Sequence, residues 1–202
     1  MQNPTPRLVL ASTSRARAAL LSSAGLSFEV KPARIDEDAI KASARAEGAP
    51  AADAATLLAE MKARRTGVAV PDALVIGADQ ILVCEGRWFD KPESATGARA
   101  QLAALRGRRH DLVTAIVCQR GNQRIWHHVA TPSLTMRQFS DAFLDDYLAA
   151  EGVTVMESVG GYRLEGMGIQ LFDRVDGDYF SVLGLPVLPL LGFLRQHGIL
   201  TA

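Results

Sequence analysis

One carboxylate interrupts an otherwise apolar run between Leu74 and Val83, where the sequence reads Leu-Val-Ile-Gly-Ala-Asp-Gln-Ile-Leu-Val. The run predicts a central β-strand that carries Asp79. Removing an isolated charge from water costs several kcal/mol unless a partner compensates for it. We therefore expect Asp79 to face a cleft, a cation or both. The alternative is that Asp79 only caps a turn that Gly77 begins.

A second candidate site follows the strand-like segment from Arg7 to Ala11, where the sequence Ser12-Thr-Ser14 precedes a helical pattern. The hydroxyls of Ser12 and Ser14, with the free N–H groups of a helix N-terminus, would form an anion cradle. Arg17 lies one turn into the helix and can reach the same anion. The pattern is compatible with an anion site, and Ser14 as a simple cap with Arg17 as a solvated charge explains it equally well.

Acidic residues around Glu37 and basic residues around Lys62 precede Asp79 in the sequence. Such charge runs are usually solvated surface, but their position before Asp79 favours one acid and one base that turn inward. Further along, Pro92 holds Lys91 in an extended conformation, and a rigidly held lysine suits a phosphate.

A glycine-rich stretch from Ser158 to Gly168 contains Glu165 and allows a flat or anionic ligand to approach the backbone closely. It lacks the G-x-G-x-x-G spacing, and the chain has no Walker loop and no G-x-S-x-G elbow. The four histidines have no metal-ligand spacing, so we expect them to be structural or exposed.

The 202 residues are 48% hydrophobic and carry 22 basic and 22 acidic side chains, which is typical of a soluble globular chain. A net charge of zero argues against a nucleic acid polymer as partner. No apolar stretch is long enough for a membrane helix, the N-terminus has no signal pattern, and both cysteines lie in apolar runs as expected for reduced thiols. We expect a cytoplasmic protein.

The hydrophobic patterns indicate both strands and helices along the chain. Strands are expected at 7–11, 28–30, 74–83, 87–89, 111–119, 123–130 and 133–136. Helices are expected after residue 14, over 39–69 with a break at 48–50, and at 94–106, 140–151 and 186–197. No repeat or linker marks a boundary, so we expect a single domain over 1–202 with two lobes.

Seven ordered blocks between about Leu8 and Leu194 closely resemble the Maf family of nucleoside triphosphate pyrophosphatases. They are Leu10-Ala-Ser-Thr-Ser14 with Arg17, Ile35-Asp36-Glu37, Leu58-Ala59 with Lys62-Ala63, Gly77-Ala78-Asp79, Asp90-Lys91-Pro92, Val113-Thr114 and Gly184-Leu185-Pro186. The resemblance implies a mixed α/β fold with an elongated, twisted sheet flanked by helices and a central cleft between two lobes, similar to the inosine triphosphate pyrophosphatases. It also implies Mg²⁺ or Mn²⁺ as cofactor, a homodimer, and hydrolysis of a nucleoside triphosphate to the monophosphate and pyrophosphate.

The family pattern also implies roles for individual residues. Asp79 matches the proton acceptor or metal-linked carboxylate, and Glu37 matches a second acid on the metal. The residues that match the substrate-binding positions are Ser12, Ser14, Arg17, Lys62 and Lys91. The chain departs from the pattern at Arg15-Ala16, where the family commonly has proline and then arginine or tryptophan, and this departure affects the edge of the nucleotide pocket.

Two positions bear on the nucleobase. Gln80 and Glu165 resemble the branch of the family that takes 7-methyl-GTP, whereas the dTTP and UTP branch has threonine and glutamine there. A carboxylate at Glu165 only accepts hydrogen bonds, which suits the N–H edge and the positive charge of 7-methylguanine. Ala16 lacks the stacking face of that branch's tryptophan, which would broaden the range of bases.

Two alternatives to this function stay open. One is a dTTP- or UTP-specific pyrophosphatase. The other is a non-catalytic nucleotide-binding regulator of cell division. For the pyrophosphatase, the resemblance implies a role in preventing the incorporation of modified nucleotides and a link to cell-division arrest.

Overall fold

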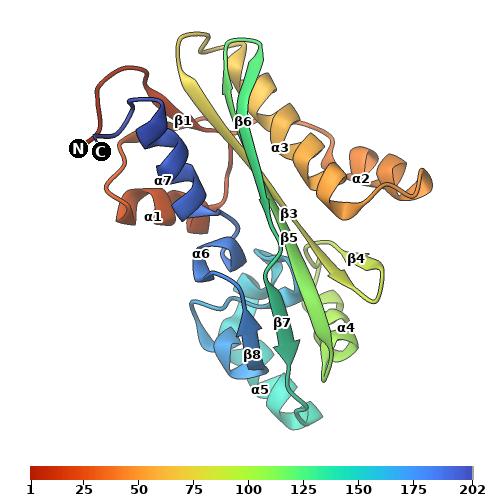
Figure 1. Cartoon of the computed structure of the whole chain (residues 1–202). Coiled ribbons are helices and arrows are strands. Elements are labelled where there is room, and N and C mark those ends of the chain that lie inside the picture. The colour runs from red at the N-terminus through yellow and green to blue at the C-terminus, as the bar shows by residue number, and fades with distance from the viewer. Residues whose placement is uncertain (202) are drawn as a thin grey trace. The chain divides into compact units, whose positions relative to one another are not determined.

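The computed structural model describes residues 1–201, and these residues form a mixed α/β structure (Figure 1). The strands are β1 (Leu8–Leu10), β2 (Phe28–Val30), β3 (Leu74–Cys84), β4 (Arg87–Phe89), β5 (Arg109–Arg120), β6 (Gln123–Ala130), β7 (Ser133–Met136) and β8 (Phe172–Asp176). The helices are α1 (Arg15–Ser23), α2 (Glu37–Ala46), α3 (Ala51–Gly67), α4 (Ala95–Leu105), α5 (Asp141–Glu151), α6 (Tyr179–Val182) and α7 (Val187–Gln196). The predicted fold class is confirmed.

The strands form a mixed sheet in the hydrogen-bonded order β2-β1-β3-β5-β7-β8, with β4 beside β3 and β6 beside β5. β1 pairs in parallel with both β2 and β3, and Leu10 lies opposite Ile76. The pairs β3–β4, β5–β6, β5–β7 and β7–β8 are antiparallel. Because β1 is buried along its whole length, it reads in the sequence as an uninterrupted apolar run.

The chain divides into two compact units. The first comprises residues 1–79, 114–130 and the described residues from 183 onward, and the second comprises 80–113 and 131–182. Two of the four boundaries in the sequence, at 79/80 and 113/114, fall inside the long strands β3 and β5, which Figure 1 shows side by side; the other two follow β6 and α6. Continuous strands explain why no linker is visible in the sequence.

The helices α1, α2, α4 and α5 begin at side-chain caps. The acceptors are the oxygens of Ser14, Asp36, Ser94 and Ser140, and each accepts a hydrogen bond from the backbone N–H three residues later. These bonds satisfy N–H groups that have no partner within the helix. The caps fix where these helices start, and the Asp36 cap starts α2 at Glu37, two residues before the start expected from the sequence.

The first unit packs α3 very closely against β3, and Gly77 makes this possible. A Cβ atom at Gly77 would lie 2.1 Å from the carbonyl oxygen of Ala59 and 2.9 Å from the backbone nitrogen of Ala63. Gly77 therefore relieves crowding against a helix and does not begin a turn, so the interpretation of Asp79 as a turn cap is wrong.

The second unit contains a strand that the sequence patterns do not indicate. β8 has the sequence Phe-Asp-Arg-Val-Asp, and its central residues are exposed. It extends β7 at the edge of the sheet, and a short polar edge strand has no continuous apolar pattern that would predict it. Three 3₁₀ helices precede it, at Gly152–Met156, Val159–Gly161 and Met167–Leu171.

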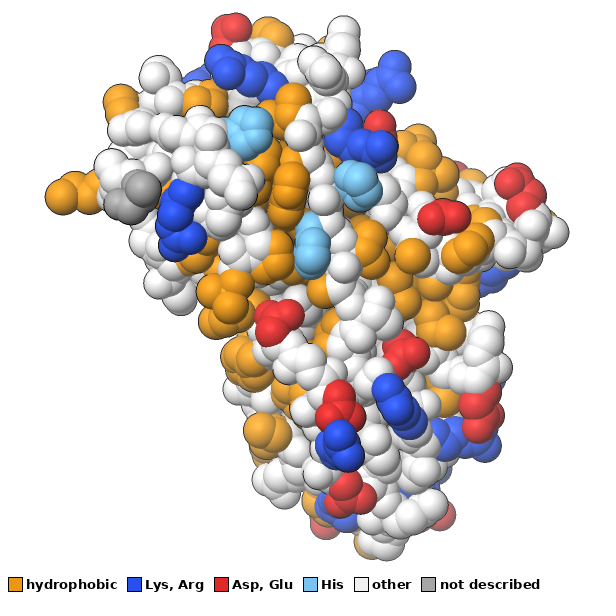
Figure 2. Space-filling model, in the orientation of Figure 1, with side chains coloured by type: hydrophobic (Ala, Val, Ile, Leu, Met, Phe, Trp, Pro, Cys, Tyr) orange, Lys and Arg blue, Asp and Glu red, His pale blue; other side chains and the backbone are white. Residues whose placement is uncertain are grey.

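Figure 2 shows histidine side chains at the surface of the face in view. His127 and His197 are exposed and His128 is half-buried, whereas His110 is buried. Both cysteines are free and buried, as expected. Among the described residues no helix is both long and apolar enough to cross a membrane.

Candidate functional site

Three predicted site residues meet around one ammonium group in the first unit. Lys62 Nζ donates a hydrogen bond to Asp79 Oδ1 at 2.6 Å and lies 2.9 Å from Glu37 Oε1. The side chains of Asp79 and Lys62 are 5% and 9% exposed, and that of Glu37 is 41% exposed. The cluster thus combines a buried ion pair with a second carboxylate that solvent reaches.

Three elements bring these side chains together. β3 carries Asp79 directly after the close approach at Gly77, and α3 presents Lys62 to it across that contact. Glu37 is the first residue of α2, where the Asp36 cap fixes the start of the helix. The cluster therefore depends on packing between segments that are distant in the sequence.

The second oxygen of Asp79 is buried but has no hydrogen-bond partner among residues 1–201. A buried carboxylate oxygen without a partner is costly, and such atoms mark places where a further group binds. Oxygen ligands from one or two carboxylates, completed by substrate phosphates and water, are what Mg²⁺ commonly uses. Asp79 and Glu37 therefore fit a hard divalent cation.

The described residues contain no group of three or more histidine, cysteine or acidic side chains placed to hold a metal ion. A cation at Asp79 and Glu37 would thus take its further ligands from groups other than histidine, cysteine and acidic side chains of residues 1–201. Water and substrate phosphates are such groups for Mg²⁺.

The residues of the predicted anion cradle lie together in the first unit. The hydroxyl oxygen of Ser12 accepts hydrogen bonds from the backbone N–H of Ser14 and from Arg17 Nη1, each at 3.2 Å. Arg17 Nε donates to the carbonyl oxygen of Gly184 at 2.8 Å. These bonds hold the guanidinium beside the N-terminus of α1, where both the helix dipole and the charge favour an anion.

Gly184 was not among the predicted site residues. Its φ of +93° favours glycine, and a Cβ atom there would lie 3.3 Å from Arg17 Nε. The only sequence signal was its position in the Gly184-Leu185-Pro186 block, which gives no indication of a contact with Arg17.

The cradle and the carboxylate pair are electrically coupled. Burial lowers the pKa of Arg17 below its ordinary value, and the negative charges of Asp79 and Glu37 oppose this by raising it. The guanidinium stays protonated in proteins. The first unit therefore holds two cations and two carboxylates in one neighbourhood, an arrangement suited to a polyanion with its counter-cation.

The remaining predicted residues belong to the second unit, each with its own contacts. Gln80 Nε2 donates to the carbonyl oxygens of Ser181 and Val182, at 3.1 Å each. Glu165 pairs with Arg163, whose Nε lies 3.4 Å from Glu165 Oε1. Lys91 is exposed. The structure thus brings together five of the nine predicted residues in the first unit. Asp79, Glu37 and Lys62 form one group, and Ser12 and Arg17 form the other. Ser14 caps α1, the helix that carries Arg17.

The Ser158–Gly168 segment rests on a buried contact that the sequence did not indicate. His110 Nε2 lies 2.8 Å from the hydroxyl oxygen of Tyr162, and both rings pack against Phe172. His110 was expected to be structural, and its burial agrees with that role.

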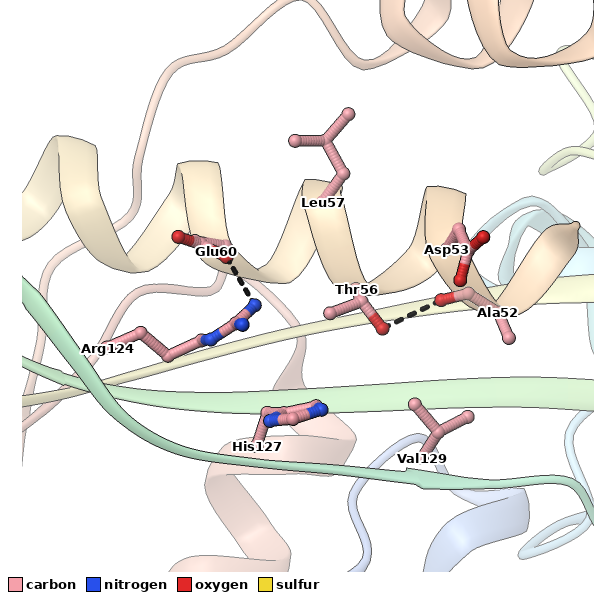
Figure 3. Close-up of a pocket in the computed structure, with 8 residues that line it drawn as sticks. All are labelled: Ala52, Asp53, Thr56, Leu57, Glu60, Arg124, His127 and Val129. Carbon is pink, nitrogen blue, oxygen red and sulfur yellow. Dashed lines mark hydrogen bonds and ion pairs between the residues drawn. The ribbon is translucent and has the colours of Figure 1, made fainter. Parts of the chain in front are cut away.

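A surface hollow of about 420 Å³ lies between α3 and β6 (Figure 3). Its lining residues are Ala52, Asp53, Thr56, Leu57, Glu60, Arg124, His127 and Val129. Figure 3 shows Arg124 reaching across it to Glu60, and the two side chains form an ion pair at 2.7 Å. None of the predicted site residues lines this hollow.

Comparison with known proteins gives one family. The family model for Maf-like protein matches residues 7–197. A nucleoside triphosphate pyrophosphatase of Granulibacter bethesdensis is 60% identical over 195 residues, which cover 96% of this chain and 99% of that protein. A 7-methyl-GTP pyrophosphatase of Rhizobium meliloti is 49% identical over 197 residues, which cover 98% and 99%.

Among solved structures, a nucleoside-triphosphatase, or dITP/XTP pyrophosphatase, of Mycobacterium abscessus matches with a TM-score of 0.38 and 17% identity. The match covers 66% of this chain and 75% of that one, and at this TM-score it carries no argument. The family match covers nearly the whole chain, and the alignments with the two relatives cover 99% of each relative. The chain belongs to the Maf family.

Proposed function

We propose that this protein is a nucleoside triphosphate pyrophosphatase, which adds water across the α–β phosphoanhydride and releases a nucleoside monophosphate and pyrophosphate. The names of the relatives support this activity. The observation that carries it is the buried carboxylate of Asp79, which has one oxygen on Lys62 and the other without a partner. A carboxylate held in this way can accept a proton from water.

The neighbouring groups suit a triphosphate. The substrate carries several negative charges, and Arg17 with the N-terminus of α1 supplies positive charge and N–H donors at a fixed position. Ser12 orients Arg17, and Lys62 contributes a second cation. We assign Ser12, Ser14, Arg17 and Lys62 to the triphosphate, and Lys91 in the second unit to the same role.

Asp79 and Glu37 would hold the divalent cation, Mg²⁺ or Mn²⁺. When bound, such a cation neutralises charge on the phosphate oxygens. The chain's own residues do the rest: Asp79 orients water and takes its proton, while the cations retain the polyphosphate. The unpartnered oxygen of Asp79 supports this assignment.

We further propose a single Maf-like domain that acts as a cytoplasmic homodimer on free nucleotides. The zero net charge supports a small substrate rather than a nucleic acid polymer. Two free, buried thiols suit a reducing compartment. We expect no association with membranes.

The activity is tested by incubating the purified protein with a panel of nucleoside triphosphates and Mg²⁺ or Mn²⁺. We expect pyrophosphate and monophosphate in equal amounts, with no orthophosphate. Binding without product would instead support the non-catalytic regulator, and release of orthophosphate would identify a phosphatase.

Glu165 is proposed to read the nucleobase, with Gln80 as its partner in selectivity. We expect kcat/KM to be higher for 7-methyl-GTP than for GTP, UTP, dTTP and CTP. Glu165→Gln should reduce this preference, because an amide both donates and accepts hydrogen bonds and cannot offset the charge of a methylated guanine. The measurement is kcat/KM across the five nucleotides.

Glu157→Gln is the matched control, since Glu157 is another exposed glutamate of the second unit. It should leave the ranking unchanged. A parental preference for UTP or dTTP, or the same ranking before and after Glu165→Gln, would remove Glu165 from this role.

A further inference from the structure

The ammonium of Lys62 occupies the position from which a cation would neutralise both acids of the site. It lies within 3 Å of one oxygen of Asp79 and one oxygen of Glu37, which come from different elements. Lys62 has almost no contact with solvent, at 7% exposed. Such burial of a lysine is rare unless its charge is paired, and both carboxylates pair with it.

The same oxygens are the ligands that a hard divalent cation prefers. A divalent cation on Asp79 and Glu37 would place two positive charges where the ammonium already contributes one. At such separations like charges repel strongly in a partly buried site. The free oxygen of Asp79 gives an entering cation its first contact, and the oxygens that contact Lys62 become fully available when the ammonium leaves.

We propose that Lys62 is a built-in substitute for the divalent cation: its ammonium holds Asp79 and Glu37 together in the metal-free protein, and it leaves them when the cation binds. The released ammonium, on a flexible four-carbon stem, then binds the phosphates of the substrate. The proposal rests on the assignment of a cation to Asp79 and Glu37 within the proposed function. It makes cation binding a competition with Lys62, which a simple phosphate-binding lysine would not produce.

The first test is the affinity of the nucleotide-free protein for Mn²⁺, measured by calorimetry. Lys62→Met removes the competitor and leaves a side chain of similar length, so the dissociation constant for Mn²⁺ should fall by about tenfold or more. Arg17→Met is the matched control, because it removes a nearby positive charge that does not contact the carboxylates. It should tighten binding much less than Lys62→Met does.

The second test uses the parent protein, so that it stands if Lys62→Met does not fold. Lys62 should react slowly with acetic anhydride without metal, because its ammonium is buried and paired, and faster when Mn²⁺ is added. Peptide mass spectrometry gives the rate at this residue, with the exposed lysine Lys91 as the reference for reagent activity.

Equal tightening by Lys62→Met and Arg17→Met, or a labelling rate of Lys62 that Mn²⁺ does not change, would overturn the proposal. Failure of both proteins to bind Mn²⁺ would overturn it as well. Both measurements are made without nucleotide, so they separate the role of Lys62 from the proposed hydrolytic activity. A chain that hydrolyses no triphosphate but shows the expected competition refutes only the proposed activity, and an active enzyme without competition refutes only the role of Lys62.

Discussion

Replacing Asp79 with asparagine is expected to lower kcat for triphosphate hydrolysis by on the order of 10²–10⁴-fold, the usual contribution of a general base. Asparagine has nearly the same shape and keeps an oxygen that can accept the hydrogen bond from Lys62 Nζ. It loses the charge that takes a proton from water and that binds a divalent cation. Glu37 still pairs with Lys62 in the variant, so the buried ammonium keeps one carboxylate.

The measurement is steady-state release of pyrophosphate, with circular dichroism and thermal unfolding to confirm that the variant is folded. Asp72→Asn is the matched control, because it makes the same chemical change at an exposed position of the first unit. Its kcat should equal that of the parent. An Asp79→Asn enzyme within a few-fold of the parent would show that Asp79 is not the base.

Most of the fold was predictable because its signals are local. Caps such as Ser94 and Ser140 fix the starts of helices, and Pro50 separates α2 from α3 because proline lacks a backbone N–H. The hairpin between β3 and β4 turns at Glu85 and Gly86, both of which have positive φ angles. β8 was missed because its pairing with β7, and not its own polar sequence, makes it a strand.

The candidate site was predictable only as a set of residue types. Nothing in the spacing of Lys62 and Asp79 shows that they form a buried pair, because their contact requires α3 to cross β3 at a glycine. Gly77 carried the relevant signal, but a glycine before an acid also begins turns. The resemblance assigned Lys62 to phosphate, and only the structure shows its ammonium on the carboxylates.

We expect acidification to lower the free energy of unfolding of this protein through the protonation of His110. His110 is 1% exposed, and burial lowers the pKa of its imidazole from 6.5 to about 4, although the charge of Asp111 opposes the change. Between these two values the unfolded chain binds a proton that the folded chain excludes. Stability from this group is therefore complete above about pH 6.5 and is lost as the pH falls toward 4, by about 3 kcal/mol in total.

His110→Gln isolates this effect from the titration of carboxylates. Glutamine does not titrate and can still form a hydrogen bond with the hydroxyl of Tyr162, so the variant should lose less stability on acidification than the parent. The quantity to compare is the free energy of unfolding in urea at about pH 7 and about pH 4.5, where the parent should lose about 2 kcal/mol more than the variant. His127→Gln, a change at an exposed histidine, should follow the parent.

Parallel losses in the parent and in His110→Gln would mean that His110 does not titrate as its burial requires. The expected difference has a structural consequence, because Tyr162 lies in the Ser158–Gly168 segment that carries Glu165. A charged imidazole can only donate a hydrogen bond at Nε2, and its charge is unfavourable at a position that solvent does not reach. Acid should therefore weaken the packing around His110 that supports this segment.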